Sequence, residues 1–476
     1  MRIMARNRFS TFVETLACDR WASQFESLIG ARNVVTKSSQ KQQFMKDEGH
    51  FRGKMPEVVL LPESVEQVSD IMKICNSFKI PVIPFGTGTG LEGGVVHVKK
   101  GVSIVLSNLG GGITKVSPED GIASVRPSVT RTGLNSMVRQ HGLFFSVDPG
   151  ADASVCGMVA TGASGTNAIR YGTMKENVVN LEIVLADGSV INTRGKNNCP
   201  PKTSAGYNLT ELFVGSEGTL GVIIEATIRL HSLPSCRTVA VTAFDTTHSA
   251  VQATMEVIQS GIPVARIEFL DDIQVAACNK YSSLTMPVAP TLFLEFHGFT
   301  DASVQSQLEY TKSICSSYNA LSFVESENNS DIDKLWKARH NAYYAALSLR
   351  EGSRGFTTDV CVPISKLADV ITLTKKDLID SNLVGTIVGH VGDGNFHVIL
   401  PVVDMEKELP KVKQFSDRLV KRALTHNGTC TGEHGVGMGK LSYLEDEVGK
   451  ECLNVMRMIK QSLDPNNIMN PGKVLK

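Results

Sequence analysis

Two histidines and a glutamate in the C-terminal part of the 476-residue chain could together hold a metal ion. His390 and His397 belong to the segment GHVGDGNFH, and Glu433 belongs to GEHG. Imidazole and carboxylate are the usual ligands of a borderline divalent ion. Two histidines and one carboxylate would leave positions open for substrate and water. The adjacent His434 would then be well placed to accept a proton from that substrate.

The spacing of the two histidines requires a turn between them. They are seven residues apart, and on an uninterrupted strand an odd offset places side chains on opposite faces. Gly392 and Gly394 interrupt the strand, so a turn could bring both imidazoles to one site. The residues alone do not decide between a metal site and two buried, hydrogen-bonded histidines. The motif H-E-x-x-H does not occur, so the common helical metalloprotease site is absent.

One arginine could recognise a carboxylate. Arg339 lies in LWKARHNAYYAA, which predicts an amphipathic helix. A guanidinium presents a planar fork of donors that suits a carboxylate. From spacing alone, a surface ion pair is the simpler interpretation of Arg339.

Three glycine-rich segments indicate a second kind of site. They are residues 86–94 (GTGTGLEGG), 148–172 (DPGADASVCGMVATGASGTNAIRYG) and 215–223 (GSEGTLGVI). Dense glycine lets backbone N–H groups approach phosphate oxygens. A tight turn explains any one segment, but the three together favour an extended, phosphate-bearing cofactor.

Neither standard nucleotide-binding motif is present. Gly88, Gly90 and Gly93 match G-x-G-x-x-G, but the strand-like VVHVKKGVSIVL follows, whereas a Rossmann turn opens a helix. A Walker A loop is excluded because Leu441 follows Gly439-Lys440, and His434 stands at the first-glycine position.

The elements that must position these residues read as a mixed, α+β chain. After a mostly polar, helical lead-in at 13–50, residues 56–85 read as strand–helix–strand, and 181–192 read as a hairpin. Residues 238–400 alternate strand-like and helical runs, and helices are predicted at 410–426 and 446–463. We therefore predict an N-terminal lead-in (1–54), a first domain (55–234), a second domain (235–427) and a C-terminal segment (428–476).

Composition excludes several classes of function. Forty-eight basic and forty-eight acidic residues give zero net charge, which argues against a nucleic-acid binder. No stretch reaches the roughly 20 apolar residues of a membrane span. Ten cysteines without a C-x-x-C pair read as free thiols in a reducing compartment. The Arg-containing N-terminus MRIMARNRFSTF, with no acid before Glu14, is compatible with a short mitochondrial presequence.

Six motifs carry a resemblance to a known family. They are PFGTGTGLEGG, DPGADASVCGMVATGASGTNAIRYG, GYNLTELFVGSEGTLGVI, GHVGDGNFH, GTCTGEHGVGMGK and MNPGKVL. In this order they resemble the FAD-linked 2-hydroxy-acid dehydrogenases, which are flavoproteins of the vanillyl-alcohol oxidase type. They are most similar to the mitochondrial branch that oxidises D-lactate and reduces cytochrome c. The resemblance runs from about residue 55 to the end.

The resemblance implies a fold and a cofactor. The fold would be a two-subdomain FAD-binding domain plus an antiparallel-sheet α+β substrate (cap) domain, with the C-terminal segment returning to the former. The residues expected along FAD are Pro84, Gly86, Thr87, Gly88, Thr89, Gly90, Leu91, Pro149, Gly150, Ala151, Ser154, Gly157, Gly162, Ser164, Gly165, Thr166, Gly221, Ile223 and Asn470. Non-covalent FAD is expected, because the loop 86–94 lacks the histidine through which some relatives attach it.

The resemblance also implies roles for the polar residues. His390, His397 and Glu433 would bind zinc or manganese, which would assist deprotonation of the substrate hydroxyl by His434. Arg339 would bind the substrate carboxylate, with Asn395 near it. A hydride would pass to flavin N5, so that D-lactate or a related D-2-hydroxy acid becomes a 2-oxo acid. Electrons would go on to cytochrome c or another acceptor.

Three alternatives stay open. A sister enzyme acting on D-2-hydroxyglutarate would need an extra cation for the second carboxylate, where this chain has Thr357, two residues before Asp359. Thr357 favours a monocarboxylic substrate, although Arg354 lies nearby. A metallohydrolase could use the His/His/Glu set, but a tightly bound flavin would exclude it. An inactive FAD-binding scaffold is disfavoured by the intact His434 and Arg339.

Overall fold

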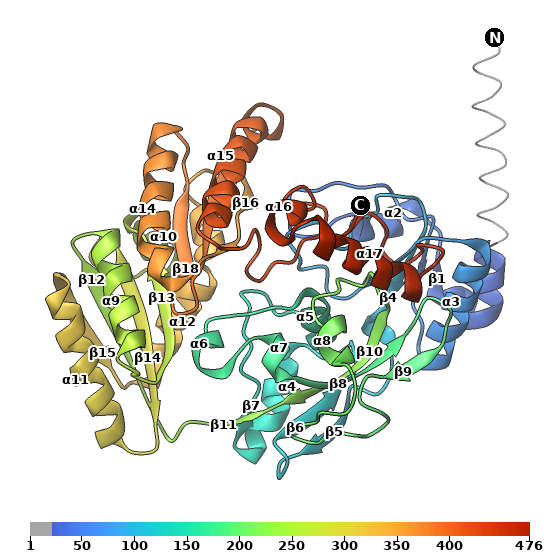
Figure 1. The fold of residues 1–476 in the computed structure, drawn as a ribbon, viewed down its shortest axis with the longest axis horizontal. Helices are drawn as coiled ribbons and strands as arrows, with labels where there is room; N and C mark the ends of the chain where they lie inside the picture. Colours follow the sequence, from blue (N-terminus) through green and yellow to red (C-terminus); the bar gives the residue numbers. More distant parts are fainter. Residues whose placement is uncertain (1–20) are drawn as a thin grey trace.

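Residues 21–476, which the computed structural model describes, form two bodies of sheets and helices placed side by side (Figure 1). The first body contains two sheets, and the second contains one large sheet that the chain enters near residue 236. The chain then returns to the first body at its C-terminal end. The presequence predicted at the N-terminus lies outside the described residues.

The first sheet of the first body is built from the predicted strand–helix–strand unit. Its strand order is β1-β2-β4-β3, with β2, β4 and β3 parallel and β1 antiparallel at the edge. The strands are β1 (Val34–Val35), β2 (Val58–Leu60), β4 (Val102–Val105) and β3 (Val82–Phe85). Because Val34–Val35 forms a strand, the prediction of a helical lead-in over 13–50 is wrong for this part of it.

Helix α3 (Val65–Phe78) has the predicted bounds because its ends carry clear signals. The hydroxyl of Ser64 accepts the N–H of Gln67, and Lys79 ends the helix in the left-handed conformation. Its buried side chains repeat at helical spacing and pack on the first sheet; they are Val68, Ile71, Met72 and Cys75.

The second sheet is antiparallel, and its central strands are buried on both faces. Its strand order is β5-β6-β10-β8-β9. The strands are β5 (Ile113–Ser117), β6 (Ile122–Val125), β10 (Val222–Arg229), β8 (Val178–Val184) and β9 (Val190–Asn192). Val222 and Ile224 of β10 join the core of the first sheet, whereas Ile223 joins the core under helix α5 (Val155–Thr161). This alternation explains why apolar side chains occur on both faces of β10, and it fastens the two subdomains together.

Short elements complete the first body. The helices are α2 (Ser38–Lys41), α4 (Arg131–Val138), α6 (Ala168–Tyr171), α7 (Met174–Asn177) and α8 (Leu209–Phe213), besides a helical segment at 21–29. The single-turn helices are η1 (Ala31–Asn33), η2 (Gln42–Met45), η3 (Leu106–Asn108) and η4 (Arg139–His141). A two-stranded ribbon pairs β7 (Leu143–Phe144) with β11 (His231–Ser232).

The second body is an antiparallel sheet of eight strands, as the resemblance implies. The order is β15-β12-β14-β13-β18-β19-β16, with β17 also paired to β19. The strands are β12 (Cys236–Phe244), β13 (Val264–Leu270), β14 (Thr291–Gly298), β15 (Ala320–Ser326), β16 (Arg354–Thr357), β17 (Val360–Cys361), β18 (Thr386–His390) and β19 (Asn395–Val402).

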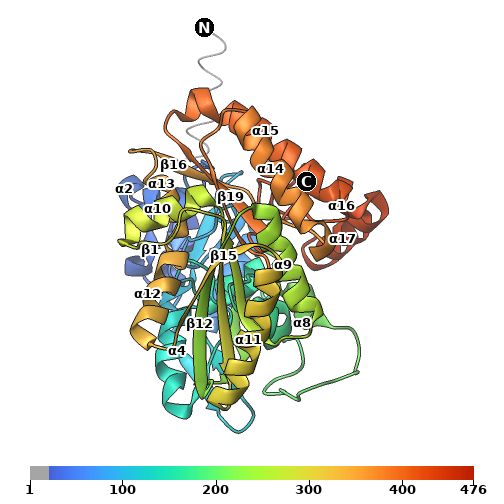
Figure 2. The same cartoon turned by 90° about the vertical axis from the view of Figure 1, so that its left-hand side faces the viewer.

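Helices cover both faces of this sheet (Figures 1 and 2). One core contains side chains from α9 (Thr247–Gln259), α11 (Asp301–Ser317), α14 (Ile364–Asp380) and α15 (Met405–Thr425). The other contains side chains from α10 (Asp272–Ser282), α12 (Asn329–His340) and α13 (Ala342–Leu347). Leu270, Val388 and Ile399 belong to this second core. Since side chains alternate along a strand, Glu268, His390 and His397 share their face.

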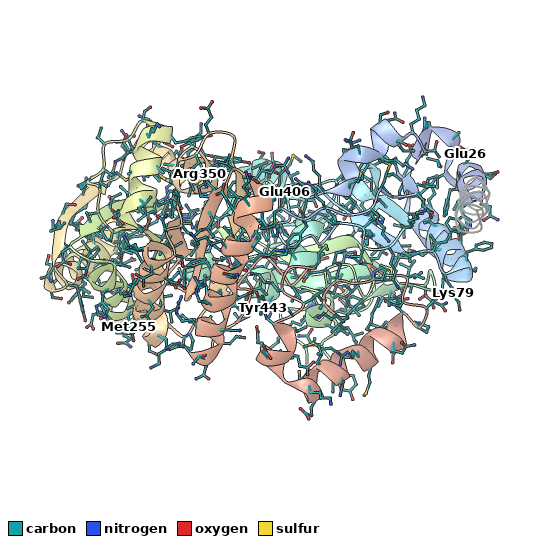
Figure 3. All side chains as sticks on the ribbon, turned by 90° about the horizontal axis from the view of Figure 1, so that it is seen from above. Glu26, Lys79, Met255, Arg350, Glu406 and Tyr443 are labelled. Atoms are coloured by element: carbon teal, nitrogen blue, oxygen red, sulfur yellow. The ribbon has the colours of Figure 1, made fainter. Side chains whose placement is uncertain are left out.

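The C-terminal segment packs on the first body. The predicted helix at 446–463 is in fact two helices, α16 (Leu444–Val448) and α17 (Lys450–Leu463), because Gly449 adopts a positive φ of 79°. The N–H of Asn470 donates to Val82 O at 2.8 Å. Seen from above, the side chains of the two bodies meet along the region where the bodies adjoin (Figure 3).

Two further features concern the chain as a whole. Within residues 21–476, no helix is both long and apolar enough to cross a membrane. All nine cysteines of the described part are free thiols.

Candidate active site

A cavity of about 340 Å3 lies between the two bodies, and most of the predicted cofactor residues form its wall. Those that line it are Pro84, Gly86, Thr87, Gly88, Thr89, Gly90, Leu91, Pro149, Gly150, Ala151, Ser154, Gly157, Thr166, Gly221, Ile223 and Asn470. The opposite wall carries Arg339, His390, His397, Glu433 and His434. The topology therefore brings the glycine loops and the polar cluster of the cap to one site.

The glycine-rich wall offers unused backbone donors. Within the described chain, no hydrogen bond is donated by the N–H groups of residues 87–91. A Cβ on Gly86 or Gly157 would stand 2.9 or 2.8 Å from the Ser154 hydroxyl oxygen. Glycine at these two positions lets the loop and helix α5 come together while their N–H groups stay accessible. Such a wall fits the phosphates of a dinucleotide.

Three predicted cofactor residues do not line the cavity. Gly162 ends helix α5 with a positive φ of 70°. Gly165 packs on Asp148, where a Cβ would lie 2.5 Å from the carboxylate oxygen. Ser164 is buried, and its hydroxyl has no partner among the residues described. Gly162 and Gly165 therefore shape the loop behind the wall.

Asp148 holds this loop against the cap. Its carboxylate accepts the Thr166 hydroxyl at 2.7 Å and the Asn167 N–H at 3.2 Å, and it forms an ion pair with Arg266 at 3.3 Å. Burial by itself raises the pKa of Asp148, but Arg266 and His340 outweigh it and hold the pKa far below its usual value. A charged, fully used carboxylate thus fixes the wall beside the cavity.

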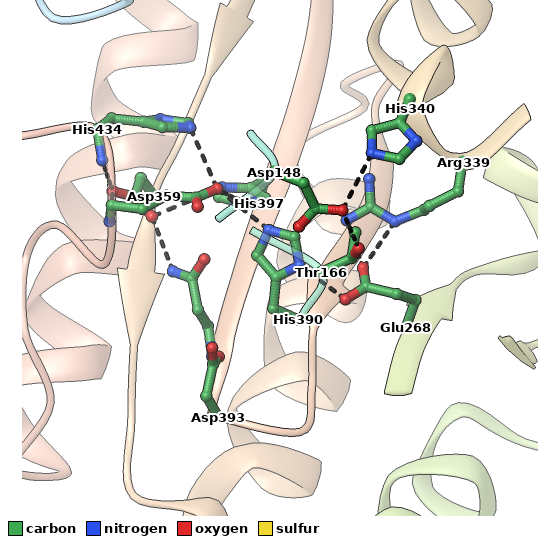
Figure 4. Close-up of polar contacts among 12 residues, drawn as sticks. Asp148, Thr166, Glu268, Arg339, His340, Asp359, His390, Asp393, His397 and His434 are labelled. Atoms are coloured by element: carbon green, nitrogen blue, oxygen red, sulfur yellow. Dashed lines mark hydrogen bonds and ion pairs between the residues drawn. The ribbon is translucent and has the colours of Figure 1, made fainter. Parts of the chain in front are cut away.

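The predicted turn does bring the two histidines to one site. Strands β18 and β19 form a hairpin across residues 391–394, and His390 pairs with Asn395 while Val388 pairs with His397. Paired residues of an antiparallel sheet point to the same side. The two imidazoles consequently lie on one face, with ring centres 5.7 Å apart (Figure 4).

Glu433 completes a three-residue cluster with the geometry of a metal site. Its Oε1 lies 3.2 Å from His390 Nε2 and 3.1 Å from His397 Nε2, while Oε2 is buried without a hydrogen-bond partner among the described residues. Ligand atoms of these three residues all lie within 4.8 Å of one another. His397 Nδ1 also lies 3.2 Å from Thr358 O, which favours a free Nε2.

The electrostatics of the cluster favour a positive charge at its centre. Burial lowers the pKa of His390, but the charges of Glu268 and Glu433 outweigh it and raise the pKa well above its usual value. Burial raises the pKa of Glu433, but His390 and His397 hold it well below its usual range. Two ionised carboxylates around one imidazole demand a cation, which a proton or a divalent metal can provide.

His434 stacks on His397, with ring centres 4.8 Å apart and planes 11° apart. Burial lowers the pKa of His434, so its imidazole tends to be neutral and able to accept a proton. Its backbone N–H and that of Glu433 both donate to Asp359 Oδ2 at 2.9 Å. Asp359, His397 and His434 form a second potential metal group, but Asp359 already accepts four hydrogen bonds from Asn395, Thr431, Glu433 and His434. The group with Glu433 is therefore the better candidate for a metal site.

Asn395 lies behind the cavity wall, not on it. Its amide nitrogen donates to Asp359 Oδ1 at 2.8 Å and to Val360 O at 2.9 Å. A Cβ on Gly432 would lie 2.0 Å from that nitrogen, so the loop carrying Glu433 rests directly on Asn395. The structure thus places Asn395 where it supports Asp359, and its expected place near the substrate stays a prediction.

Arg339 lies in the last turn of α12 and is 8% exposed. Its Nε donates to Glu268 Oε2 at 2.8 Å. Its Nη2 lies 2.6 Å from the same oxygen but is without a hydrogen-bond partner in the described chain. The surface ion pair that spacing alone favours is wrong, because the pair is buried and faces the cavity.

Sequence reasoning missed three buried carboxylates that support the site. Glu268, Asp359 and Asp148 are each at most 4% exposed and hold functional side chains through hydrogen bonds. The only local signal is an acid inside an apolar strand, as in VARIEFL around Glu268. The hydrogen-bond partners of these acids are distant in the sequence. Glu268 and Arg339 are 71 residues apart, and Asp359 and Glu433 are 74 residues apart.

Solved structures show which fold the chain has. The chain superposes with a TM-score of 0.78 on a 4-ethylphenol oxidase from Gulosibacter chungangensis, at 19% identity over 95% of this chain and 96% of the other. Its TM-score with a p-cresol methylhydroxylase is 0.76, at 19% identity over 96% of each chain. The fold is that of the vanillyl-alcohol oxidase type of flavoproteins.

Family models place the chain more narrowly. An FAD binding domain matches residues 56–194, and the C-terminal domain of FAD linked oxidases matches residues 233–474. The chain therefore belongs to the FAD-linked oxidases and is an FAD-dependent oxidoreductase. This membership sets the metallohydrolase alternative aside.

Two curated relatives cover most of the chain. The probable mitochondrial D-lactate dehydrogenase of Danio rerio is 51% identical over 471 residues, which are 98% of this chain and 94% of the fish protein. The mitochondrial D-lactate dehydrogenase (cytochrome) of Arabidopsis thaliana is 42% identical over 440 residues, or 90% of this chain and 77% of the plant protein.

Proposed function

We propose that this FAD-dependent enzyme oxidises D-lactate and related D-2-hydroxy acids to 2-oxo acids in mitochondria and passes the electrons to cytochrome c or another acceptor. One observation carries the proposal. A single cavity has a glycine-rich wall suited to FAD and a facing wall with Arg339, a His/His/Glu cluster and His434. The names of the fish and plant relatives support the substrate, and the plant name also supports the acceptor.

FAD would be held without a covalent bond by the glycine-rich wall. The free N–H groups of residues 87–91 would bind the pyrophosphate, and Ile223 and Asn470 would lie along the ring system. When bound, FAD accepts the hydride that leaves the substrate Cα. The chain's own residues must therefore hold that carbon next to the ring and remove the hydroxyl proton.

A zinc or manganese ion would be held by His390, His397 and Glu433. These three residues provide two imidazoles and one carboxylate, which such ions prefer as ligands. Glu433 Oε2 has no hydrogen-bond partner among the described residues, so it is available to bind the ion. The ion would polarise the substrate hydroxyl and thereby lower its pKa.

The protein side chains supply the remaining chemistry. Arg339 Nη2, which has no hydrogen-bond partner among the described residues although it is ion-paired with Glu268, would bind the substrate carboxylate and orient Cα. His434 would take the hydroxyl proton as the hydride leaves Cα, so that the carbon–oxygen bond becomes a carbonyl. The substrate loses one proton and one hydride, which balances its conversion to a 2-oxo acid.

The visible spectrum of the purified protein under anaerobic conditions tests the proposal. Addition of D-lactate is expected to bleach the flavin absorption, whereas L-lactate is expected to leave it unchanged. Bleaching by D-2-hydroxyglutarate but not by D-lactate would assign the chain to the sister activity. A flavin spectrum indifferent to all D-2-hydroxy acids would contradict the proposed reaction.

The substrate side of the cavity favours a monocarboxylate. Arg339 is the only arginine or lysine among the described residues that line the cavity, and Val388, Ile399 and Thr357 lie on the same wall. Arg354 is exposed and does not line the cavity. A second carboxylate would thus be buried without a cation, which is costly.

We expect Thr357→Lys to shift the preference toward a dicarboxylate. The Thr357 hydroxyl is buried and has no hydrogen-bond partner in the described chain, so an ammonium there would face the cavity. The ratio of kcat/KM for D-2-hydroxyglutarate to that for D-lactate should rise about tenfold or more, as one charged hydrogen bond allows. Steady-state kinetics measure this ratio. Thr357→Val keeps the shape of threonine and adds no charge, so the ratio should stay at its wild-type value. An equal rise in both variants would contradict the charge argument.

A further inference from the structure

One buried carboxylate joins the two functional parts of the cap wall. Glu268, on β13, is 0% exposed and uses a different oxygen for each of two partners. Its Oε2 accepts the Nε–H of Arg339 at 2.8 Å, and its Oε1 lies 2.7 Å from His390 Nδ1 (Figure 4). Glu268 itself does not line the cavity.

Strand geometry fixes this position. β13 pairs with β18 in a register that sets Leu270 opposite Val388 and thus Glu268 opposite His390. The residue that follows Glu268 is the core side chain Phe269, which points to the other face of the sheet and is fully buried. The strand therefore holds the side chain of Glu268 on the face of the sheet that carries His390.

Each contact of Glu268 determines what its partner can do. An ionised carboxylate at Nδ1 keeps the proton of His390 on that nitrogen and leaves Nε2, which faces Glu433 at 3.2 Å, free to bind a cation. The bond to Nε of Arg339 holds the plane of the guanidinium, while Nη2 has no hydrogen-bond partner within residues 21–476. One side chain thus sets the protonated nitrogen of an imidazole and the orientation of a guanidinium.

We propose that Glu268 is the positioning residue that couples the carboxylate-binding Arg339 to the metal-binding His390, so that substrate anchor and metal site are set as one unit. This inference rests on the proposed function, which assigns the roles of Arg339 and His390. It adds that both roles depend on one carboxylate which touches neither substrate nor metal.

Glu268→Gln separates the two contacts at nearly constant volume. A glutamine amide has one acceptor oxygen, and its NH2 group only donates, so it cannot accept from both partners. If the NH2 faces Arg339, the guanidinium loses its bond. If it faces His390, Nδ1 must become the acceptor, the proton moves to Nε2, and that nitrogen can no longer bind a metal. In either orientation the contact that remains is to a neutral amide and is weaker than the bond to the carboxylate, so both partners are affected.

The test measures metal affinity and substrate affinity separately on the FAD-loaded protein. Metal is removed with a chelator, and Mn2+ and Zn2+ are titrated back by calorimetry; KM for D-lactate is then measured at saturating metal. Glu268→Gln is expected to weaken metal binding about 10- to 100-fold, as loss of an outer hydrogen-bond partner does. It is also expected to raise KM about tenfold.

The chain contains a matched control on the neighbouring strand. Glu295 of β14 is also a buried carboxylate between an arginine and a histidine, with Arg266 at 3.4 Å and His297 at 2.6 Å. It does not line the cavity. Glu295→Gln therefore repeats the chemical change away from the metal cluster, and its metal affinity and KM should stay at the wild-type values.

Each outcome decides the inference. It is overturned if Glu268→Gln keeps wild-type metal affinity or wild-type KM, or if Glu295→Gln shows the same shifts. If Glu268→Gln does not fold, Glu268→Asp replaces it, since the shorter carboxylate cannot reach both partners; wild-type values there also overturn the inference. Wild-type protein that binds neither ion would instead contradict the proposed metal site, and the inference with it.

Discussion

Replacement of His434 by alanine is expected to lower kcat for D-lactate about 10²- to 10⁴-fold, which is the usual contribution of a general base. FAD content and metal content should stay at wild-type levels. The reason is geometric: His434 stacks on His397 at the cavity wall, but the better metal group is made by His390, His397 and Glu433. Burial lowers the pKa of His434, which leaves a neutral imidazole to accept the proton.

Stopped-flow measurement of anaerobic flavin reduction isolates this step from reoxidation by the acceptor. His426→Ala is the matched control, because His426 caps α15 through a bond to Arg422 O and does not line the cavity. It should reduce flavin at the wild-type rate. Wild-type flavin reduction in His434→Ala would remove His434 from the mechanism. Loss of metal in that variant would instead place His434 among the ligands with Asp359 and His397.

The fold was predictable where local signals are strong. The helix from Val65 to Phe78 has its predicted bounds because Ser64 caps it and apolar residues repeat at helical spacing. The hairpin carrying His390 and His397 was predictable from the two glycines between them. Val34–Val35 was not, since two residues carry no periodicity and this strand exists only by pairing with β2.

The sequence predicted which segments line the cavity, but it did not predict the hydrogen bonds that hold their side chains in place. Residues that face the cavity occur in recognisable segments, whereas Glu268 is a single acid inside an apolar strand, and nothing local to Asp359 shows that it accepts hydrogen bonds from Glu433 and His434. Asn395 illustrates the limit: its motif does not show that its amide nitrogen donates to Asp359 and Val360. Only the three-dimensional pairing of distant strands shows which polar side chain supports which.

Loss of the metal is expected to have the second large effect. His390→Ala should abolish metal binding and lower kcat/KM about 10²- to 10³-fold, because a metal supplies several kcal/mol of charge stabilisation. FAD should be retained, since the glycine-rich wall lies on the other body. Metal analysis and the flavin spectrum of the same sample measure both quantities.

Chelation of the wild-type protein tests the role of the metal without a mutation. A mutation-free test is needed because His390→Ala leaves Glu268 and Glu433 buried without the imidazole that both contact, which destabilises the protein. Activity should fall on chelation and return with Mn2+ or Zn2+ in the wild type, but not in His390→Ala. His231→Ala, which removes a partly buried histidine bonded to Asn177 outside the cavity, should respond as the wild type does. Full activity in metal-free wild-type protein would show that His390 and His397 are hydrogen-bonded core histidines. The protonated His390 between its two carboxylates would then supply the positive charge that the cluster requires.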